Sequence, residues 1–212
     1  MATYDLQEQE QIDTIKAFWA RWGGWISGVI TVALLAFIAY QGWNWWQRRQ
    51  AAQAAQLYTV IEKAVAQNDW KQLKSAAEPI KAAYPSSAYA ARAALLAARA
   101  DVELGEFAAA RSQLEWVTAH AKEAGLIAVS HLRLAELMLD AKQYEAALAQ
   151  LAKAHDSAFD ALFLSARGDV LSAQGDPKAA AAAYRDALAK MPPDSQNTVL
   201  VQMKLAAQGV NP

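Results

Sequence analysis

The 212-residue sequence predicts an all-α protein: one N-terminal transmembrane helix, then an array of helical hairpins with a C-terminal closing helix. Three observations predict this fold class. Alanine, the strongest helix former, occupies 51 positions. An uncharged, aromatic-rich stretch lies near the N-terminus. The rest of the chain shows helical spacing of apolar residues, with turn signals that recur at nearly constant intervals.

The 26 residues from Trp22 to Gln47 carry no charge. As a helix they span about 39 Å, which exceeds the bilayer hydrocarbon core of about 30 Å. Trp25 lies near one end and Trp43 near the other, where membrane interfaces favour aromatic rings with a polar edge. We therefore predict a transmembrane helix at 22–47. One alternative, a cleaved signal peptide, has a basic start and a shorter apolar region, whereas this chain starts with acidic residues. The other, a buried helix of a soluble protein, is disfavoured because 26 uncharged residues exceed ordinary core helices.

The segment 1–21 places Ile15, Phe18 and Trp19 at helical spacing with charges between them. This pattern predicts a short amphipathic helix at the membrane surface, and a plain extension of the transmembrane helix is the alternative. Two basic residues flank the predicted span on each side, so the positive-inside rule does not decide the orientation.

Residues 48–212 form the predicted soluble domain. Turn signals begin at Asn68, Gly105, Lys142 and Gly175, separated by 37, 37 and 33 residues. Such spacing is typical of tetratricopeptide repeats, which are antiparallel helix pairs of about 34 residues. We place four units at about 54–85, 91–124, 128–158 and 161–193, with a closing helix at 195–207. Pro79 is expected to kink or split the second helix of the first unit.

The stretch from Arg49 to Gln67 contains no helix breaker, so the transmembrane helix is expected to continue into the first repeat helix. A hinge near Gly42 or Arg48 is the competing interpretation.

Composition and motifs argue against several classes of function. The formal net charge of −1 argues against a nucleic-acid partner, and the absence of cysteine excludes disulfides and thiolate metal sites. His120, His131 and His155 lack the spacing of paired metal ligands, and we find no catalytic motif. We therefore predict no enzyme activity, cofactor or metal. An enzyme hypothesis would rest on His155 and Asp160.

The first helix of each hairpin is expected to line the inner face of a curved array, where a protein could bind. Aligning the units on their turns gives a candidate protein-binding groove of thirteen residues: Tyr58, Glu62, Val65, Arg92, Leu95, Arg99, Val102, Leu132, Glu136, Leu139, Ser165, Asp169 and Ser172. The alternative is that many of these side chains pack between repeats or against the closing helix.

Several stretches together resemble the YfgM-like family, the ancillary subunit of the bacterial SecYEG translocon. The resemblance rests on the order of features along the chain: the acidic start Glu10–Trp19, the single span with its Trp-rich exit, Leu132–Ala135 ahead of Lys142-Gln143, the segment Ala166–Asp176, and the tail Val201–Leu205.

The resemblance implies a single-pass type II protein of the bacterial inner membrane, with a cytoplasmic N-terminus and a periplasmic repeat domain. It implies three partners besides the lipid bilayer: the SecYEG translocon, a membrane-anchored periplasmic chaperone of the peptidyl-prolyl-isomerase type, and translocated client proteins. The expected role is a non-catalytic adaptor that helps pass translocated proteins to periplasmic chaperones. The alternative is a structural scaffold subunit of another envelope assembly, such as secretion or cell-division machinery.

Overall fold

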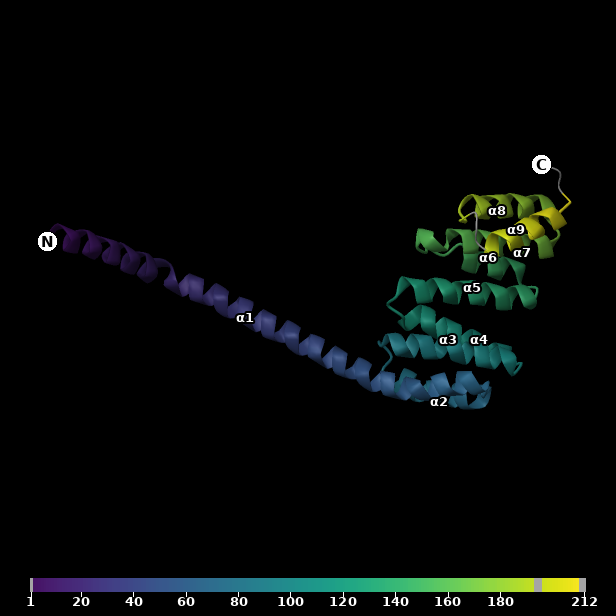
Figure 1. Ribbon diagram of the computed structural model, residues 1–212, viewed down its shortest axis with the longest axis horizontal. Helices are drawn as coiled ribbons and strands as arrows, with labels where there is room; N and C mark the ends of the chain where they lie inside the picture. The colour runs from purple at the N-terminus through teal and green to yellow at the C-terminus, as the bar shows by residue number, and fades with distance from the viewer. Residues whose placement is uncertain (1, 193–195, 210–212) are drawn as a thin grey trace. The chain divides into compact units, whose positions relative to one another are not determined.

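The computed structural model describes residues 2–192 and 196–209. These residues form nine α-helices and one short 3-10 helix and include no strand, which confirms the all-α fold class (Figure 1). The chain divides into two compact parts, an N-terminal part, Met1–Arg49, and a repeat domain, Gln50–Pro212. The first helix, α1 (Ala2–Gln67), contributes residues to both parts.

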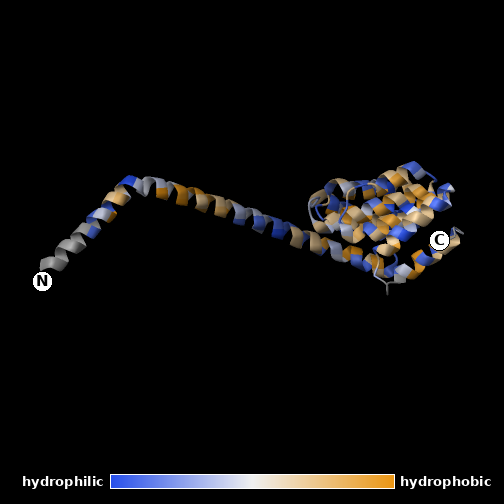
Figure 2. Cartoon of the chain, turned by 90° about the horizontal axis from the view of Figure 1, so that it is seen from above, coloured by the Kyte–Doolittle hydropathy of each residue, from blue (hydrophilic) through white to orange (hydrophobic). Residues whose placement is uncertain are grey.

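The N-terminal part exposes the apolar side chains of α1. Trp25, Val32 and Ile38 are each more than 60% exposed. Two hydroxyls in this stretch bond back to the helix, with Ser27 Oγ 2.7 Å from the Gly23 carbonyl and Thr31 Oγ1 2.8 Å from the Ser27 carbonyl. A lipid-facing helix must satisfy its polar groups internally in this way. Among the described residues, α1 is the one helix long and apolar enough to cross a membrane (Figure 2).

The repeat domain is a stack of helical hairpins. The end of α1 pairs with α2 (Trp70–Ala83), and we call this pair hairpin 1. Hairpin 2 comprises α3 (Ala88–Glu103) and α4 (Phe107–His120), and hairpin 3 comprises α5 (Ala124–Asp140) and α6 (Tyr144–Leu151). Hairpin 4 comprises α7 (Asp160–Gln174) and α8 (Pro177–Ala189), followed by α9 (Gln196–Ala207). From α2 onward each α-helix packs against the next α-helix in the chain order, and α1 shares a buried core with α2 (Figure 1).

All four hairpin turns share one backbone conformation. Asn68, Gly105, Lys142 and Gly175 have φ values between 53° and 90°, in the left-handed region. In each turn, this residue and the one after it donate backbone hydrogen bonds into the end of the preceding helix, as when Gly175 bonds the Ser172 carbonyl and Asp176 bonds the Leu171 carbonyl. This pair of bonds satisfies carbonyls that a helix end leaves free. The turn signals in the sequence mark these four positions.

The core of the first two hairpins is built mainly from alanine. Ala77, Ala93 and Ala97 are fully buried there, alongside larger residues such as Ile61 and Leu73. One charged side chain is also buried, because Asp101 on α3 is 0% exposed. Its Oδ1 lies 2.8 Å from Lys74 Nζ on α2, and Lys74 also pairs with Glu106. Neither oxygen of Asp101 makes a well-directed hydrogen bond within the described chain. The positive charge of Lys74 therefore has to compensate for burying the Asp101 carboxylate.

Two local features differ from simple expectation. α2 runs as a single helix from Trp70 to Ala83 with Pro79 inside it, so the helix is not split. α6 has only eight residues, and a 3-10 helix, η1 (Ser157–Phe159), follows before α7. Asp156 caps this turn, because its carboxylate accepts a hydrogen bond from the Ala158 amide at 2.9 Å. Asp176 caps α8 in the same manner, through the Ala179 amide.

Candidate functional site

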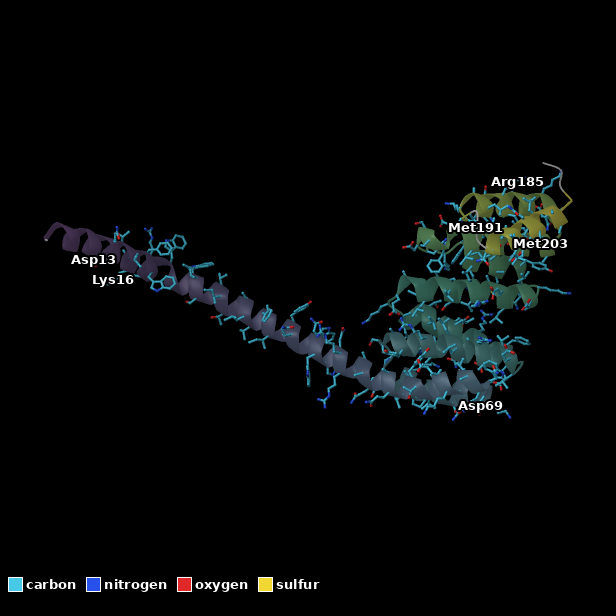
Figure 3. The ribbon with its side chains drawn as sticks, in the orientation of Figure 1. Asp13, Lys16, Asp69, Arg185, Met191 and Met203 are labelled. Carbon is cyan, nitrogen blue, oxygen red and sulfur yellow. The ribbon has the colours of Figure 1, made fainter. Side chains whose placement is uncertain are left out.

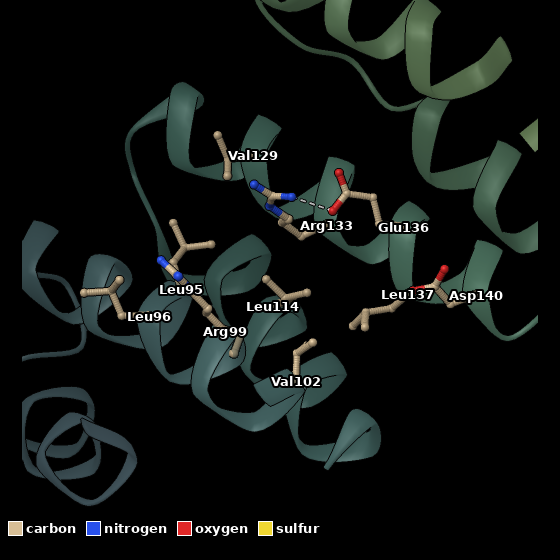
Figure 4. A pocket seen from close by; sticks show the side chains of 11 residues that line it. Leu95, Leu96, Arg99, Val102, Leu114, Val129, Arg133, Glu136, Leu137 and Asp140 are labelled. Carbon is tan, nitrogen blue, oxygen red and sulfur yellow. Dashed lines mark hydrogen bonds and ion pairs between the residues drawn. The ribbon is translucent and has the colours of Figure 1, made fainter. Parts of the chain in front are cut away.

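A hollow of the repeat domain lies between α3 and α5 (Figure 4). We call it the α3–α5 groove. Its volume is about 400 Å³, within the range of ligand-binding pockets. Its lining residues come from α3, α4 and α5: Leu95, Leu96, Ala98, Arg99, Val102, Leu114, Val129, Arg133, Glu136, Leu137 and Asp140. Most are apolar, so the groove offers a hydrophobic surface with charges among its lining.

The charged residues of the groove differ in how they are neutralised. Arg133 Nη1 donates to Glu136 Oε2 at 2.6 Å, which forms an ion pair on α5. The Arg99 guanidinium lies 5.4 Å from the centre of the Trp70 ring, close enough for a cation–π interaction. Its contact with Glu103 is long, at 3.9 Å. Asp140 forms no ion pair within the part of the chain that the structure describes.

Four of the thirteen residues predicted from the sequence line this groove. Leu95, Arg99 and Val102 contribute from α3, and Glu136 contributes from α5 (Figure 4). They come together because successive first helices of the hairpins, α3 and α5, lie side by side. The groove therefore spans hairpins 2 and 3 only.

The predicted residues of hairpin 1 form a separate cluster next to Arg92 on α3. Tyr58 packs against Tyr89, with ring centres 5.4 Å apart. Burial raises the pKa of the Tyr58 phenol; the charge of Glu62 adds to this effect and that of Arg92 opposes it. Val65 packs against the alanine-rich core.

The remaining predicted residues are engaged in packing. Leu132 and Leu139 contact the core of hairpins 3 and 4, and Ser165 is buried. On α7, Asp169 Oδ2 lies 2.7 Å from Lys204 Nζ, and Ser172 Oγ donates to Gln208 Oε1 at 3.1 Å. Lys204 belongs to α9, and Gln208 is the first residue after that helix. The inner face of hairpin 4 is thus occupied by the closing helix, as the alternative interpretation expected for such residues.

The prediction on α5 is shifted by one position. Leu132 and Leu139 were expected to face the groove, whereas Arg133 and Asp140 line it. One residue corresponds to a rotation of about 100° around a helix. The groove residues Val129, Arg133, Glu136, Leu137 and Asp140 do share one helical face, at spacings of three, four and seven. That spacing was the signal available in the sequence.

A smaller hollow of about 260 Å³ lies beside His155 and Asp160. Both side chains already have partners. Asp160 Oδ2 accepts a hydrogen bond from Lys190 at 2.7 Å, and His155 Nε2 lies 3.3 Å from Asp160 Oδ1. The His155 ring also stacks on Phe163 at 3.6 Å. These contacts join the start of α7 to the end of α8. No cluster of three or more potential metal ligands occurs among the residues that the structure describes.

Comparisons with known proteins agree with this architecture. The sequence profile of a tetratricopeptide repeat-like domain family matches residues 16–210. The ancillary SecYEG translocon subunit of Neisseria gonorrhoeae (strain ATCC 700825 / FA 1090) is 34% identical over 149 residues, which are 70% of this chain and 71% of that protein. Among solved structures, the MamA RS-1 ArsTM double mutant aligns with a TM-score of 0.51 and 14% identity, over 74% of this chain and 94% of that chain.

The structural likeness at 14% identity shows the fold alone. The profile match covers most of the chain and includes all four hairpins and α9. The identity to the gonococcal protein extends over two thirds of both chains. The family resemblance seen in the sequence is therefore confirmed, and the chain belongs to the YfgM-like family of tetratricopeptide repeat-like proteins.

Proposed function

We propose that this protein is a non-catalytic, membrane-anchored adaptor at the SecYEG translocon. In this proposal α1 anchors the chain in the inner membrane, with a cytoplasmic N-terminus and a periplasmic repeat domain. The repeat domain binds proteins through the α3–α5 groove and helps pass translocated proteins to periplasmic chaperones. The relative named as an ancillary SecYEG translocon subunit supports the location, and the groove supports protein binding.

The groove carries the binding part of the proposal. Apolar side chains from three helices line it, and Val102 is 40% exposed there, so a hydrophobic side chain of a partner gains free energy by covering them. Peptides commonly bind helical domains by laying apolar anchors into such a groove. Arg99 and Asp140 bring opposite charges to the groove lining, which would orient a bound segment.

The anchor gives the adaptor its mechanism. A binding domain tethered to the membrane meets proteins that emerge nearby at a high effective concentration, so moderate affinity is sufficient for capture. Weak binding also permits release to a second protein. A membrane-anchored chaperone of the peptidyl-prolyl-isomerase type is the proposed recipient, because tethering of both proteins to one membrane keeps them close.

The test is affinity purification of the full-length protein from bacterial membranes in mild detergent, with partners identified by mass spectrometry. Val102→Asp places a charge in the groove, and Val60→Asp is the matched control. Both valines are 40% exposed and lie in helices, but Val60 does not line the groove. We expect Val102→Asp to lose client and chaperone proteins while Val60→Asp retains them.

Two results would contradict parts of the proposal separately. Retention of all partners by Val102→Asp would exclude the groove as the binding surface. Absence of translocon subunits, together with enrichment of another envelope assembly, would replace the adaptor with the scaffold alternative. A reporter that is active only outside the cytoplasm, fused after Pro212, tests the orientation, and silence with good expression would reverse it.

A further inference from the structure

The outer face of α9 is an apolar stripe that nothing in the described structure covers. Val199, Leu200 and Met203 are 58%, 52% and 66% exposed. In the repeat domain only one other described large apolar side chain, Phe107, exceeds 50% exposure, and it stands alone on α4. The three α9 residues share one helical face, since they follow spacings of one, three and four. Contiguous exposed apolar surface of this kind marks a contact site.

The opposite face of α9 is fully engaged. Val201 is 2% exposed and packs with Tyr184 and Ala187 of α8, and Leu205 lies against the same cluster. Lys204 pairs with Asp169 on α7, and Thr198 Oγ1 donates to the Pro192 carbonyl at 2.8 Å. These contacts hold α9 in one orientation. They therefore fix the direction in which the apolar stripe, including Met203, points (Figure 3).

α9 occupies the place of a first helix in a fifth hairpin. It packs on α8 as α3 packs on α2, α5 on α4 and α7 on α6. In the interior of the array, each first helix is followed by a second helix and by the next hairpin, which cover its other faces. α9 has no such follower among the described residues. Neighbouring repeats of such arrays stack through apolar helix faces, and the exposed face of α9 has this apolar character.

We propose that the apolar stripe of α9 binds the same stripe on a second copy of this chain, forming a two-fold symmetric dimer. The charge pattern favours this occupant. From Asn197 to Gly209 the only charged residue is Lys204, which lies beside the stripe, four residues after Leu200, and is neutralised by its ion pair with Asp169. Two identical faces therefore meet without like-charge repulsion, which a two-fold contact requires because each patch faces itself. Interior first helices of the array are covered by other helices, and in the dimer α9 of the second copy would cover the stripe in the same way.

The absence of cysteine permits a direct test. In the full-length protein Met203→Cys creates the only thiol, so a bismaleimide crosslink of doubled mass that carries two different affinity tags, one from each of two co-expressed forms, joins two copies. The matched control is Arg185→Cys, an exposed position on α8 (Figure 3). We expect a crosslinked dimer with Met203→Cys and none with Arg185→Cys. In the Met203→Cys background, Leu200→Glu is expected to reduce the dimer at least about tenfold, since it buries a repelling charge pair.

Each other outcome overturns the proposal in a distinct way. A Met203→Cys crosslink to a band of different mass assigns the stripe to another protein. A dimer that survives Leu200→Glu places the contact elsewhere, including on α1. A monomeric mass of the purified full-length protein at tens of micromolar, with no crosslink, leaves the stripe without a second copy. Circular dichroism melting of Leu200→Glu checks that the domain remains folded. This proposal is independent of the α3–α5 groove, so either can fail alone.

Discussion

The ring of Tyr184 on α8 lies directly against the backbone of Gly168 on α7. A Cβ atom built at Gly168 would be 2.6 Å from Tyr184 Cδ1, closer than any normal contact. The ring cannot swing away, because Tyr184 is 2% exposed and its hydroxyl donates to Asp169 Oδ1 at 2.8 Å. The two helices of hairpin 4 approach closely at this point because Gly168 has no side chain.

Gly168→Ala is therefore expected to destabilise the repeat domain by about 1–3 kcal/mol, the usual cost of overpacking. Urea denaturation followed by circular dichroism measures this change. Gly125→Ala is the matched control, because its Cβ would meet Phe159 at an ordinary 3.6 Å. Equal stability of the two variants would mean that hairpin 4 adjusts to the added methyl group.

Removing Lys74 should be far more costly than removing a surface lysine. Lys74→Met leaves the buried Asp101 carboxylate without its counter-charge, and such losses cost about 3–5 kcal/mol. Lys71→Met, on the exposed side of α2, is expected to change stability by less than about 0.5 kcal/mol. The double variant Lys74→Met with Asp101→Leu should recover much of the loss, because no unpaired charge remains. A double variant less stable than Lys74→Met would contradict this account.

The ion pair at the start of α7 predicts a specific dependence on pH. The hydrogen bond from Lys190 lowers the pKa of Asp160, with further lowering by the charges of Lys190 and His155. A carboxylate with a lowered folded-state pKa stabilises the fold above its unfolded pKa of about 3.9 and loses this effect as the pH falls through the folded value. Asp160→Asn should thus be less stable than the parent protein at pH 7, and the difference should vanish once the pH falls below the folded-state pKa of Asp160. A constant difference across this range would show that the charge of Asp160 contributes nothing.

The left-handed residue of each hairpin turn predicts opposite effects at two positions. Lys142 has φ of 59°, which costs a residue with a Cβ about 1 kcal/mol, so Lys142→Gly is expected to stabilise the domain by up to about that amount. Gly175 has φ of 90°, and Gly175→Ala should destabilise it by about 1 kcal/mol although no atom lies within 4 Å of the added Cβ. Thermal denaturation of both variants tests the pair. Shifts of the same sign would exclude the turn conformation as the cause.

The sequence allowed the all-α fold class and the four hairpin turns to be predicted, because these depend on local chemistry. Asn, Gly, Lys-Gln and Gly-Asp at a regular spacing interrupt helical periodicity, and the structure places a left-handed residue at each of these points. Pro85 likewise follows the end of α2 at Ala83. The short α6 and the 3-10 helix after it were not predicted, because the Asp156 cap interrupts the helical pattern over only a few residues.

The candidate groove was harder to predict because it depends on which face of each helix is covered. α5 carries leucine or methionine on several sides, as at Leu132, Leu137 and Met138, so periodicity did not single out one face. The choice is made by neighbouring helices, which bury Met138 and cover much of Leu132 and leave Leu137 beside the groove. On α7, the docking of α9 decided the outcome, and this contact joins residues about 35 positions apart.

The packing of each helix against its neighbours in the sequence also bears on how this domain folds. Every helix of the described repeat domain finds its main neighbours among the one or two helices adjacent to it in sequence. Such low contact order favours rapid folding, because only short loops must close before contacts form. Each hairpin can complete its own turn before the following one has emerged from the ribosome or from a membrane pore. A chain arriving one end first would then fold hairpin by hairpin, with α9 the last helix to find its place.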